Sequence, residues 1–284
     1  MKISAVIITL NEERNIERCL RSVMQVADEI VVLDSGSSDR TREICEAWPV
    51  CYHERPFVRY DMQKNAAARK ASYDHILSLD ADEALSEELQ KAIAHVKDHW
   101  QHDGYACNRL TAFCGKWIRH GEWYPDRIVR LFDRRKASWN GRLHERLQFS
   151  GNGTMGFLKG DLLHYSYDSV SHFLQKTDRY TEMAAAELYE KGVHPTPYHL
   201  YIKPAYRFLY AFIMRRGFLD GFAGYCIARL TAQRLFLKFI KLRILQEPDR
   251  LHHQTAVKKL YRHNTAAYAE PQKELLPENK VLHA

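Results

Sequence analysis

The chain of 284 residues has no long uncharged apolar run, because no stretch reaches 18 residues without an Asp, Glu, Lys or Arg. A simple membrane-spanning helix is therefore not expected. The six cysteines form no Cys-x-x-Cys pair and no zinc-type spacing, which favours free thiols in a reducing cytoplasm. Repeats and low-complexity tracts are absent as well. With 45% apolar and 27% charged residues, the composition is typical of a globular protein rather than a disordered or fibrous one.

The first residues resemble a signal peptide only in part. Lys2 precedes an apolar run over residues 3–10, but the run continues into Asn11-Glu12-Glu13-Arg14 without a small-residue cleavage site. Since the run is rich in β-branched residues, it predicts a strand that is buried on both faces.

Positive charge is concentrated in the C-terminal part of the chain. Residues 1–170 hold 24 basic and 25 acidic residues, whereas residues 171–284 hold 18 and 10. Within residues 200–246, nine basic residues accompany a single acid, Asp220. Such a basic region is expected to meet an anionic partner.

Apolar runs and helical spacings alternate in the first hundred residues, which predicts an α/β fold. Strands separated by helices form right-handed βαβ units and a mainly parallel sheet. Residues 3–9, 30–33, 50–52 and 75–79 are the predicted strands, with helices over 16–23, 39–47, 60–72 and 86–100. Further short strands are predicted over 105–113, 128–132, 147–149 and 161–165, followed by helices only from residue 169.

Polar clusters follow three of the predicted strands. Ligands of parallel α/β sheets bind beyond the carboxyl ends of the strands, so these clusters predict a binding site. The three clusters are Thr9-Leu10-Asn11-Glu12, Asp34-Ser35-Gly36 and Asp80-Ala81-Asp82.

Asp80 and Asp82 are the strongest candidates for metal binding. On an extended segment, residues i and i+2 point the same way, so both carboxylates can face one site. Two carboxylates, phosphate oxygens and water suit Mg²⁺ or Mn²⁺. The alternative is a solvated start of the next helix.

Asp34 and Lys64 are further candidates at the same edge of the sheet. Asp34 either caps the next helix or accepts hydrogen bonds from a base or ribose, and Ser38 and Asp39 are available for the capping. Lys64 either meets a phosphate or is solvated.

Several longer segments carry a family resemblance. They are Ala5-Val6-Ile7-Ile8-Thr9-Leu10-Asn11-Glu12-Glu13, Val31-Val32-Leu33-Asp34-Ser35-Gly36-Ser37-Ser38-Asp39-Arg40-Thr41, Gln63-Lys64-Asn65-Ala66-Ala67 and Leu77-Ser78-Leu79-Asp80-Ala81-Asp82-Glu83. Together they resemble the family 2 glycosyltransferases, which have the GT-A fold. Trp123-Tyr124-Pro125-Asp126-Arg127-Ile128-Val129-Arg130-Leu131-Phe132, His144-Glu145 and the basic tail are similar to the bacterial lipopolysaccharide-core type, which adds glucose to heptose.

The resemblance implies an inverting transfer from a nucleotide sugar, with UDP-glucose as the expected donor. Thr9, Asn11 and Asp34 would then contact the nucleoside, and Asp80 with Asp82 would hold the metal ion and the diphosphate. Glu12 and Lys64 complete the predicted donor site.

An inverting enzyme needs one base for the acceptor hydroxyl. Glu145 is the first candidate, because it follows the Asp-x-Asp site where the family has its acidic base. Its alternative role is a surface salt bridge with Arg142 or Arg146. Asp126 is the rival base. His164 is a candidate third metal ligand, with a structural histidine as the alternative.

The predicted organisation is a GT-A domain over residues 1–170, a basic amphipathic helical extension over 171–260 and a polar tail over 261–284. The predicted function is metal-dependent transfer of a sugar to a lipopolysaccharide-core or other cell-envelope glycan. Sugar transfer to a polyprenyl phosphate is the alternative reaction. A non-catalytic nucleic-acid-binding protein is the alternative of another class, but no RNA-binding signature or helix-turn-helix spacing supports it.

Residues 200–246 are expected to dock on an anionic membrane without spanning it, which predicts a peripheral protein on the inner face of the cytoplasmic membrane. Packing of the same stripes on the catalytic domain is the alternative. The apolar stripes comprise Leu219, Phe222, Ala223, Cys226, Ile227 and Leu230, and Ala205, Phe208, Leu209, Phe212 and Ile213. Arg234, Lys238 and Lys241 form the predicted basic face.

Overall fold

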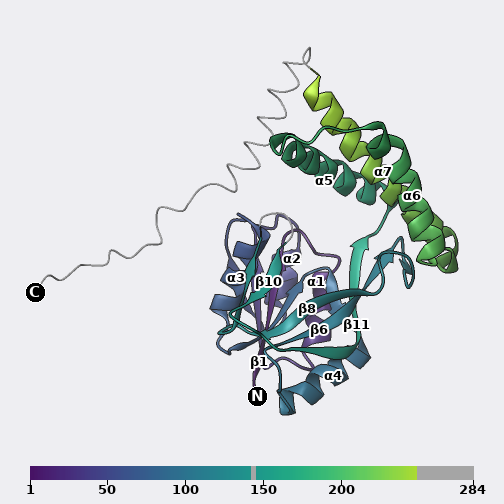
Figure 1. Ribbon diagram of the computed structural model, residues 1–284. Coiled ribbons are helices and arrows are strands. Elements are labelled where there is room, and N and C mark those ends of the chain that lie inside the picture. The colour runs from purple at the N-terminus through teal and green to yellow at the C-terminus, as the bar shows by residue number, and fades with distance from the viewer. Residues whose placement is uncertain (142–144, 248–284) are drawn as a thin grey trace, which may run out of the picture.

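A computed structural model describes residues 1–141 and 145–247 of the chain. Its centre is a nine-stranded sheet in the order β3-β2-β1-β4-β8-β6-β11-β5, with β7 paired to β6 (Figure 1). The strands of this sheet are β1 (Ile3–Thr9), β2 (Glu29–Asp34), β3 (Cys51–Glu54), β4 (His75–Asp80), β5 (Glu83–Leu85), β6 (Gly104–Phe113), β7 (Lys116–Trp117), β8 (Asp126–Asp133) and β11 (Met155–Tyr167).

The first four strands are parallel, as the sequence predicts, and β1 lies between β2 and β4. Thr9 lies opposite Asp34 and Ile8 lies opposite Asp80, so three predicted site segments end side by side. Strand β8 runs antiparallel to both β4 and β6, which makes the sheet mixed. The reason is the connection from β6 to β8, which has no crossover helix of the kind that parallel neighbours require.

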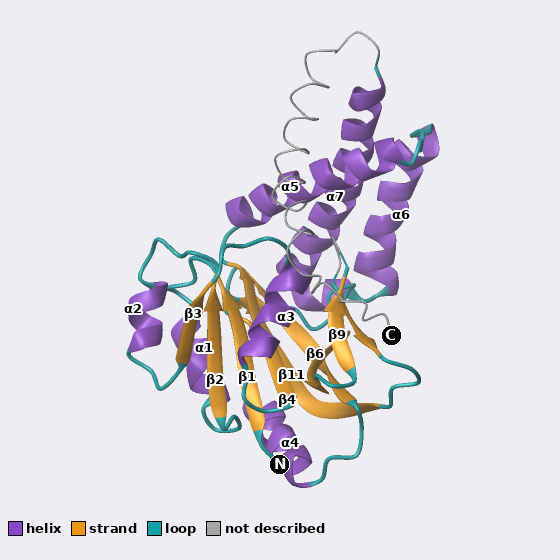
Figure 2. Ribbon diagram, turned by 90° about the vertical axis from the view of Figure 1, so that its left-hand side faces the viewer, coloured by secondary structure: helices purple, strands orange, loops and turns teal. Residues whose placement is uncertain are grey.

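Helices cover both faces of the sheet (Figure 2). Apolar residues of α1 and α4 pack on one face in a cluster with Ile3, Ala5 and Ile7. The alternate side chains of β1, Val6 and Ile8, pack on the other face with α3 and β9. Every residue of β1 is buried because the strand lies between these two layers. The covering elements are α1 (Ile16–Val23), α2 (Thr41–Glu46), α3 (Tyr60–Lys70), α4 (Glu87–Asp98) and the small sheet of β9 (Ala137–Asn140) and β10 (Arg146–Phe149).

A region of helices follows β11 and lies over one end of the sheet (Figures 1 and 2). It is joined to the sheet domain by Asp220, whose carboxylate accepts hydrogen bonds from the backbone N–H groups of Arg119 and His120, at 3.1 and 2.8 Å. Within the described ranges, no helix is long and apolar enough to cross a membrane. The elements are α5 (Val170–Glu190), η1 (Tyr198–Ile202), α6 (Lys203–Leu209), η2 (Tyr210–Met214), η3 (Gly217–Asp220) and α7 (Gly221–Gln246).

The stripe predicted to face a membrane along residues 219–230 is corrected by the structure. Ile227 is only 6% exposed and packs with Phe113, Ile118 and Phe173, because α7 is the inner helix of this region. Only the start of the stripe is open to solvent, and Phe222 there is 80% exposed.

The basic face predicted on α7 is corrected too. Lys241 is paired with Asp178 of α5 at 2.7 Å, while Arg234 and Lys238 line a cavity within the molecule. The domain boundaries at residues 170 and 260 stay predictions, and the second, like the polar tail, lies outside the described residues.

Candidate active site

Two buried polar atoms without hydrogen-bond partners in the described chain, Thr9 Oγ1 and Asp34 Oδ2, lie at the ends of the adjacent parallel strands β1 and β2. Asp80 lies at the end of β4, on the other side of β1, and its carboxylate contacts the cations Lys64 and Arg130. Burying a polar atom without a partner costs about 1–3 kcal/mol, so such a group points to a missing ligand. The structure therefore brings together Thr9, Asp34 and Asp80, which the sequence predicts as donor-binding residues.

Asp34 is fully buried, and its two carboxylate oxygens have different surroundings. Oδ1 accepts hydrogen bonds from the backbone N–H groups of Gly36 and Ser37, at 2.6 and 2.7 Å. These bonds hold the turn after β2, whereas Oδ2 accepts no backbone hydrogen bond. The nearby Tyr52 has a raised pKa, first because it is buried and then because of the Asp34 charge.

Asn11 and Glu12 form the turn after β1. Asn11 has a positive φ of 54°, and its side-chain oxygen accepts a hydrogen bond from the backbone of Ser38 at 2.8 Å. Glu12 accepts one from Asn15 at 2.8 Å. Burial, followed by the charge of Asp82, raises the pKa of Glu12 to about 7. Asn11, Glu12 and Asp82 line a cavity of about 470 Å³.

Lys64 is the central cation of the site. Its side chain is 1% exposed, and its Nζ lies 3.1 Å from Asp80 Oδ1 and 3.1 Å from Glu145 Oε1. Asp80 also contacts Arg130 at 3.0 Å. Burial alone would raise the pKa of Asp80, but Lys64 and Arg130 outweigh it and hold the pKa well below its usual value. Asp80 is therefore ionised.

Glu145, the first candidate base, is thus brought to the site through Lys64. Its side chain is 22% exposed and lines a second, larger cavity, so it is open to a second substrate. Arg142 lies outside the described residues. In the part of the chain that the structure describes, Glu145 is paired with Lys64 and shows no ion pair with Arg146.

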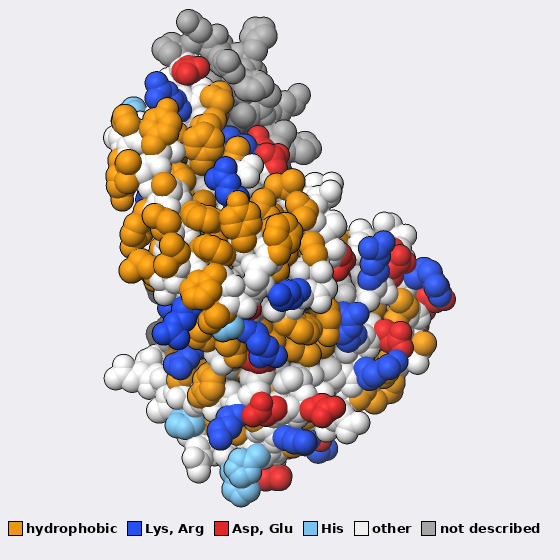
Figure 3. Space-filling view, turned by 90° about the vertical axis from the view of Figure 1, so that its right-hand side faces the viewer, with side chains coloured by type: hydrophobic (Ala, Val, Ile, Leu, Met, Phe, Trp, Pro, Cys, Tyr) orange, Lys and Arg blue, Asp and Glu red, His pale blue; other side chains and the backbone are white. Residues whose placement is uncertain are grey.

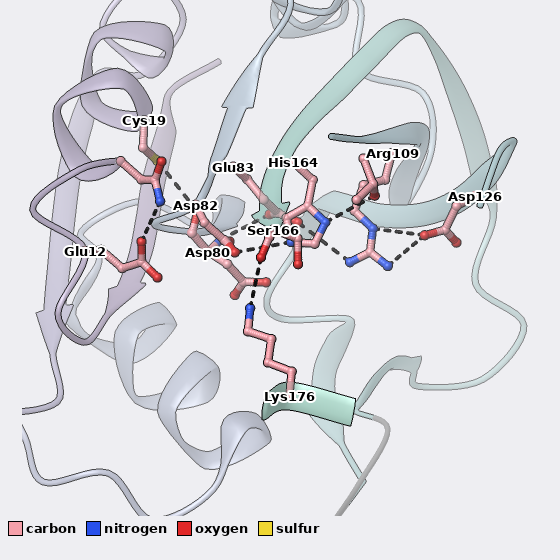
Figure 4. Close-up of polar contacts among 12 residues, drawn as sticks. Glu12, Cys19, Asp80, Asp82, Glu83, Arg109, Asp126, His164, Ser166 and Lys176 are labelled. Carbon is pink, nitrogen blue, oxygen red and sulfur yellow. Dashed lines mark hydrogen bonds and ion pairs between the residues drawn. The ribbon is translucent and has the colours of Figure 1, made fainter. Parts of the chain in front are cut away.

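Asp82 and His164 face one another across the site (Figure 4). His164 Nε2 lies 3.3 Å from Asp82 Oδ2, and this contact outweighs burial to lower the pKa of Asp82. No group of three or more His, Cys, Asp or Glu side chains in the described ranges is arranged to hold a metal ion by itself. Two carboxylates whose other ligands come from a diphosphate and water still fit Mg²⁺ or Mn²⁺, and the carboxylates of Asp80 and Asp82 with His164 beside them are a donor set of that kind.

Asp126, the rival base, is paired with Arg109 through contacts of 2.7 and 2.9 Å (Figure 4). The structure does not bring it to Lys64 or Asp80. Trp123, in the same segment, packs with Phe113, Tyr167 and Phe173.

Two residues of the site, the buried Glu83 and the half-buried Lys176, were not assigned from the sequence. Glu83 accepts a hydrogen bond from Arg130 at 2.6 Å and another from the backbone N–H of Asp80 at 3.1 Å. The pair of Glu83 and Arg130 therefore fixes the turn that carries Asp80 and Asp82. The position of Glu83 directly after Asp82 was the available signal. Lys176, which lines both cavities, has no such signal in the sequence.

The family model described as glycosyl transferase family 2 matches residues 4–172, more than half of the chain. The chain belongs to this family. The match covers the GT-A sheet and every site residue discussed above except Lys176. The glycosyltransferase therefore carries its family's catalytic unit on β1 to β11.

Curated relatives extend the match into the helical region. An uncharacterized glycosyltransferase of Rickettsia bellii (strain RML369-C) is 32% identical over 259 residues, which cover 86% of this chain and 87% of that protein. The lipopolysaccharide core biosynthesis glycosyltransferase LpsC of Rhizobium meliloti (strain 1021) is 27% identical, covering 83% of this chain and 92% of LpsC. Among solved structures, S. aureus TarS 1-349 in complex with UDP-GlcNAc has a TM-score of 0.44 and 15% identity, over 94% of this chain and 91% of that one.

Proposed function

We propose that this glycosyltransferase transfers a sugar, with inversion, from a nucleotide sugar to a lipopolysaccharide-core or other cell-envelope glycan. The observation that carries the donor part is the pair of unpartnered buried oxygens on Thr9 and Asp34, next to Asp80 at the end of the adjoining strand. An acceptor oxygen on Asp34 and a hydroxyl on Thr9 suit the base and ribose of a nucleoside. UDP-glucose is the donor expected from the resemblance of the sequence.

The acceptor hydroxyl must lose its proton as it attacks the sugar. Glu145 is the proposed base, because it lines the larger cavity and contacts Lys64, which in turn contacts Asp80 of the donor site. Lys64 keeps Glu145 oriented, and its positive charge also stabilises the negative charge that develops on the leaving diphosphate. Because inversion needs no covalent sugar intermediate, one carboxylate is sufficient.

Asp82 and Asp80 are the proposed ligands for Mg²⁺ or Mn²⁺, with His164 as a third group beside Asp82. A divalent cation bound there would neutralise the charge of the departing nucleoside diphosphate as a Lewis acid. Asp80 already contacts Lys64 and Arg130, so Asp82 is the ligand with more remaining capacity.

The proposal of a glycan acceptor is supported by LpsC, which is named as a lipopolysaccharide core biosynthesis glycosyltransferase and matches 83% of this chain. Transfer to a polyprenyl phosphate uses the same donor machinery. A matched set of acceptors therefore belongs in the test.

An anionic membrane surface is the proposed partner of the helical region. Figure 3 shows exposed apolar side chains gathered over this region, with basic side chains at their border. We define the apolar tip as the exposed large apolar residues between the end of α6 and the first turns of α7. Arg215 and Arg216, both exposed, lie within it and supply charge complementary to anionic lipid. The apolar tip comprises Leu209, Ile213, Met214, Phe218, Leu219, Phe222 and Tyr225.

The experiment is a donor screen that measures release of nucleoside diphosphate by the full chain with Mg²⁺, Mn²⁺ or EDTA. Core oligosaccharide and polyprenyl phosphate are the two acceptors. The expected result is metal-dependent turnover of one nucleotide sugar, stimulated by the oligosaccharide. Stimulation by polyprenyl phosphate alone would move the function to the alternative reaction, and no turnover with any donor would contradict the proposal.

A further inference from the structure

A second cavity, of about 1030 Å³, lies between the helical region and the catalytic domain. Helices α5, α6 and α7 form its walls, and Glu145 and Arg109 of the catalytic domain line its other side. Lys176 lines both this cavity and the smaller one that contains Asp82 (Figure 4), so the two adjoin. We call the larger cavity the basic groove. Its volume is at the upper end of the range for small-molecule sites, which leaves room for more than one sugar ring.

The basic groove holds cations that the protein does not neutralise. Its two acids are already engaged, because Glu187 is paired with Lys191 at 2.5 Å and Glu145 with Lys64 at 3.1 Å. Arg207 and Arg109 are likewise engaged in ion pairs. The cations that have no ion pair with another described residue are Lys176, Lys203, Arg234 and Lys238.

These cations come from three different helices; Lys203, Arg234 and Lys238 lie near one another, whereas Lys176 lies toward Glu12 and Asp82. Lys176 is on α5, Lys203 is on α6, and Arg234 and Lys238 are one turn apart on α7. The pKa of Lys238 is lowered, first by burial and then by the positive charges of Lys203, Arg234 and Arg207. Holding like charges together destabilises the folded chain unless an anion lies between them. An anion bound between these cations would relieve the repulsion.

Tyrosines line the same groove and indicate what else the ligand contains. Tyr206 and Tyr210 of the α6–η2 segment are stacked with 6.0 Å between ring centroids. A tyrosine ring offers a flat apolar face to the C–H groups of a sugar, and its hydroxyl offers a hydrogen bond to a sugar hydroxyl. Anion-binding cations beside such rings suit a charged saccharide.

We propose that the basic groove binds the acceptor, and that the acceptor is a saccharide that carries phosphate groups near the hydroxyl to be glycosylated. This inference rests on the proposed function, and it names the chemical class of the second substrate. Phosphate fits because Lys and Arg meet it with charge-assisted hydrogen bonds. Glu145 at the end of the groove then faces the sugar that is bound there.

The test uses phosphorylated core oligosaccharide released from lipopolysaccharide, before and after chemical removal of its phosphates, titrated into the full chain by calorimetry. The double variant Arg234→Gln with Lys238→Gln removes two groove cations. Arg243→Gln with Lys241→Gln removes the same charge from α7 outside the groove lining. We expect the groove variant to bind the phosphorylated saccharide at least roughly tenfold more weakly, as for lost charge-assisted hydrogen bonds. The control should bind it as the unchanged protein does.

The unchanged protein should also bind the dephosphorylated saccharide at least roughly tenfold more weakly. Equal affinity for the two saccharides, or an equal effect of the groove and control variants, would overturn the proposal. The proposal would also be overturned if the groove variant lost binding to phosphatidylglycerol vesicles but kept its affinity for the phosphorylated saccharide. That result would assign the cations to lipid headgroups.

Thermal melting and UDP affinity of each variant report on folding. The single substitution Lys238→Arg keeps the positive charge at this position, so this variant should retain saccharide binding. Failure of the proposed function is distinguishable, because it shows as absence of nucleotide-sugar turnover in the unchanged protein whatever the saccharide affinity.

Discussion

The ammonium nitrogen of Lys64 lies 3.1 Å from a carboxylate oxygen of Glu145, although 81 residues separate the two in the chain. The same ammonium group contacts Asp80, so one buried cation joins the donor side of the site to the proposed base. Lys64 is the cation that the two carboxylates share, and Asp80 has Arg130 as a second partner at 3.0 Å.

Replacing Lys64 with Met should therefore affect both stability and turnover. Asp80 and Glu145 would lose a shared cation, and because both are partly exposed we expect a loss of about 2–3 kcal/mol in the free energy of unfolding. Turnover should fall by roughly tenfold to a hundredfold, as for a displaced catalytic group. Urea denaturation and diphosphate release measure the two effects. Lys70→Met, at the exposed end of α3, is the matched control, and an equal loss in both variants would contradict this role.

Glu145→Gln keeps the shape of the side chain and removes its ability to accept a proton. Turnover should fall by roughly 10² or more, as for a lost general base, while the affinity for UDP stays the same. Asp126→Asn provides the comparison, because Asp126 is held by Arg109 away from Lys64. If Asp126→Asn abolished turnover and Glu145→Gln did not, the base would be Asp126.

Asp82→Asn tests the metal ligands. Mn²⁺ should tighten the binding of UDP to the unchanged protein, and the substitution should weaken the apparent affinity for Mn²⁺ by about 10–100-fold, as for a disturbed metal site. Asp80→Asn should also weaken binding, whereas Asp98→Asn, an exposed acid at the end of α4, should not. Calorimetric titration with and without EDTA measures this. Unchanged Mn²⁺ dependence in both site variants would move the metal away from these residues.

Glu12 should make the stability of the ligand-free protein depend on pH. Its pKa is raised from 4.5 to about 7, chiefly by burial, so the folded state retains a proton that the unfolded chain has lost. The free energy of unfolding should then decrease as pH rises between these two values, and stay reduced above them. Glu12→Gln should raise the melting temperature at about pH 8 more than at about pH 5. Glu13→Gln, an exposed neighbour, should show no such difference.

The apolar tip should bind anionic vesicles. The double substitution of Phe218 and Phe222 with Ser removes two exposed rings and should reduce co-sedimentation with phosphatidylglycerol vesicles at low salt. High salt should weaken the binding of the unchanged protein, because Arg215 and Arg216 contribute through charge. Phe157→Ser, an exposed ring on the catalytic domain, is the control. A full chain that stays in the supernatant at low salt would contradict the membrane proposal.

The sequence predicted the strand ends well because local pattern determines them. An apolar β-branched run followed by a polar turn indicates both the strand and its carboxyl end, and this located Thr9, Asp34 and Asp80. The same reasoning did not find β5, which has only three residues. It also left the direction of β8 open, because that direction depends on how the chain returns after β6.

The charge network could not be read from local pattern, since its partners are distant in the chain. Lys64 was a candidate for phosphate contact, but its burial between Asp80 and Glu145 follows from packing of α3 against β9. The helical stripes were misassigned for a related reason. A stripe of apolar residues on α7 is equally suited to a membrane or to Phe173, and only the tertiary structure distinguishes them.

The contacts of Asp220 fix the position of the helical region relative to the catalytic domain. This carboxylate accepts hydrogen bonds from the backbone of Arg119 and His120, so it ties the start of α7 to the catalytic domain. Within the helical region, a side chain at Gly224 would clash with the carbonyl oxygen of Gly217, so α7 packs closely on η3. If the apolar tip lies on a membrane as proposed, Glu145 would stand at a fixed distance from that membrane. We would then expect the enzyme to favour glycans whose free hydroxyl lies at that distance.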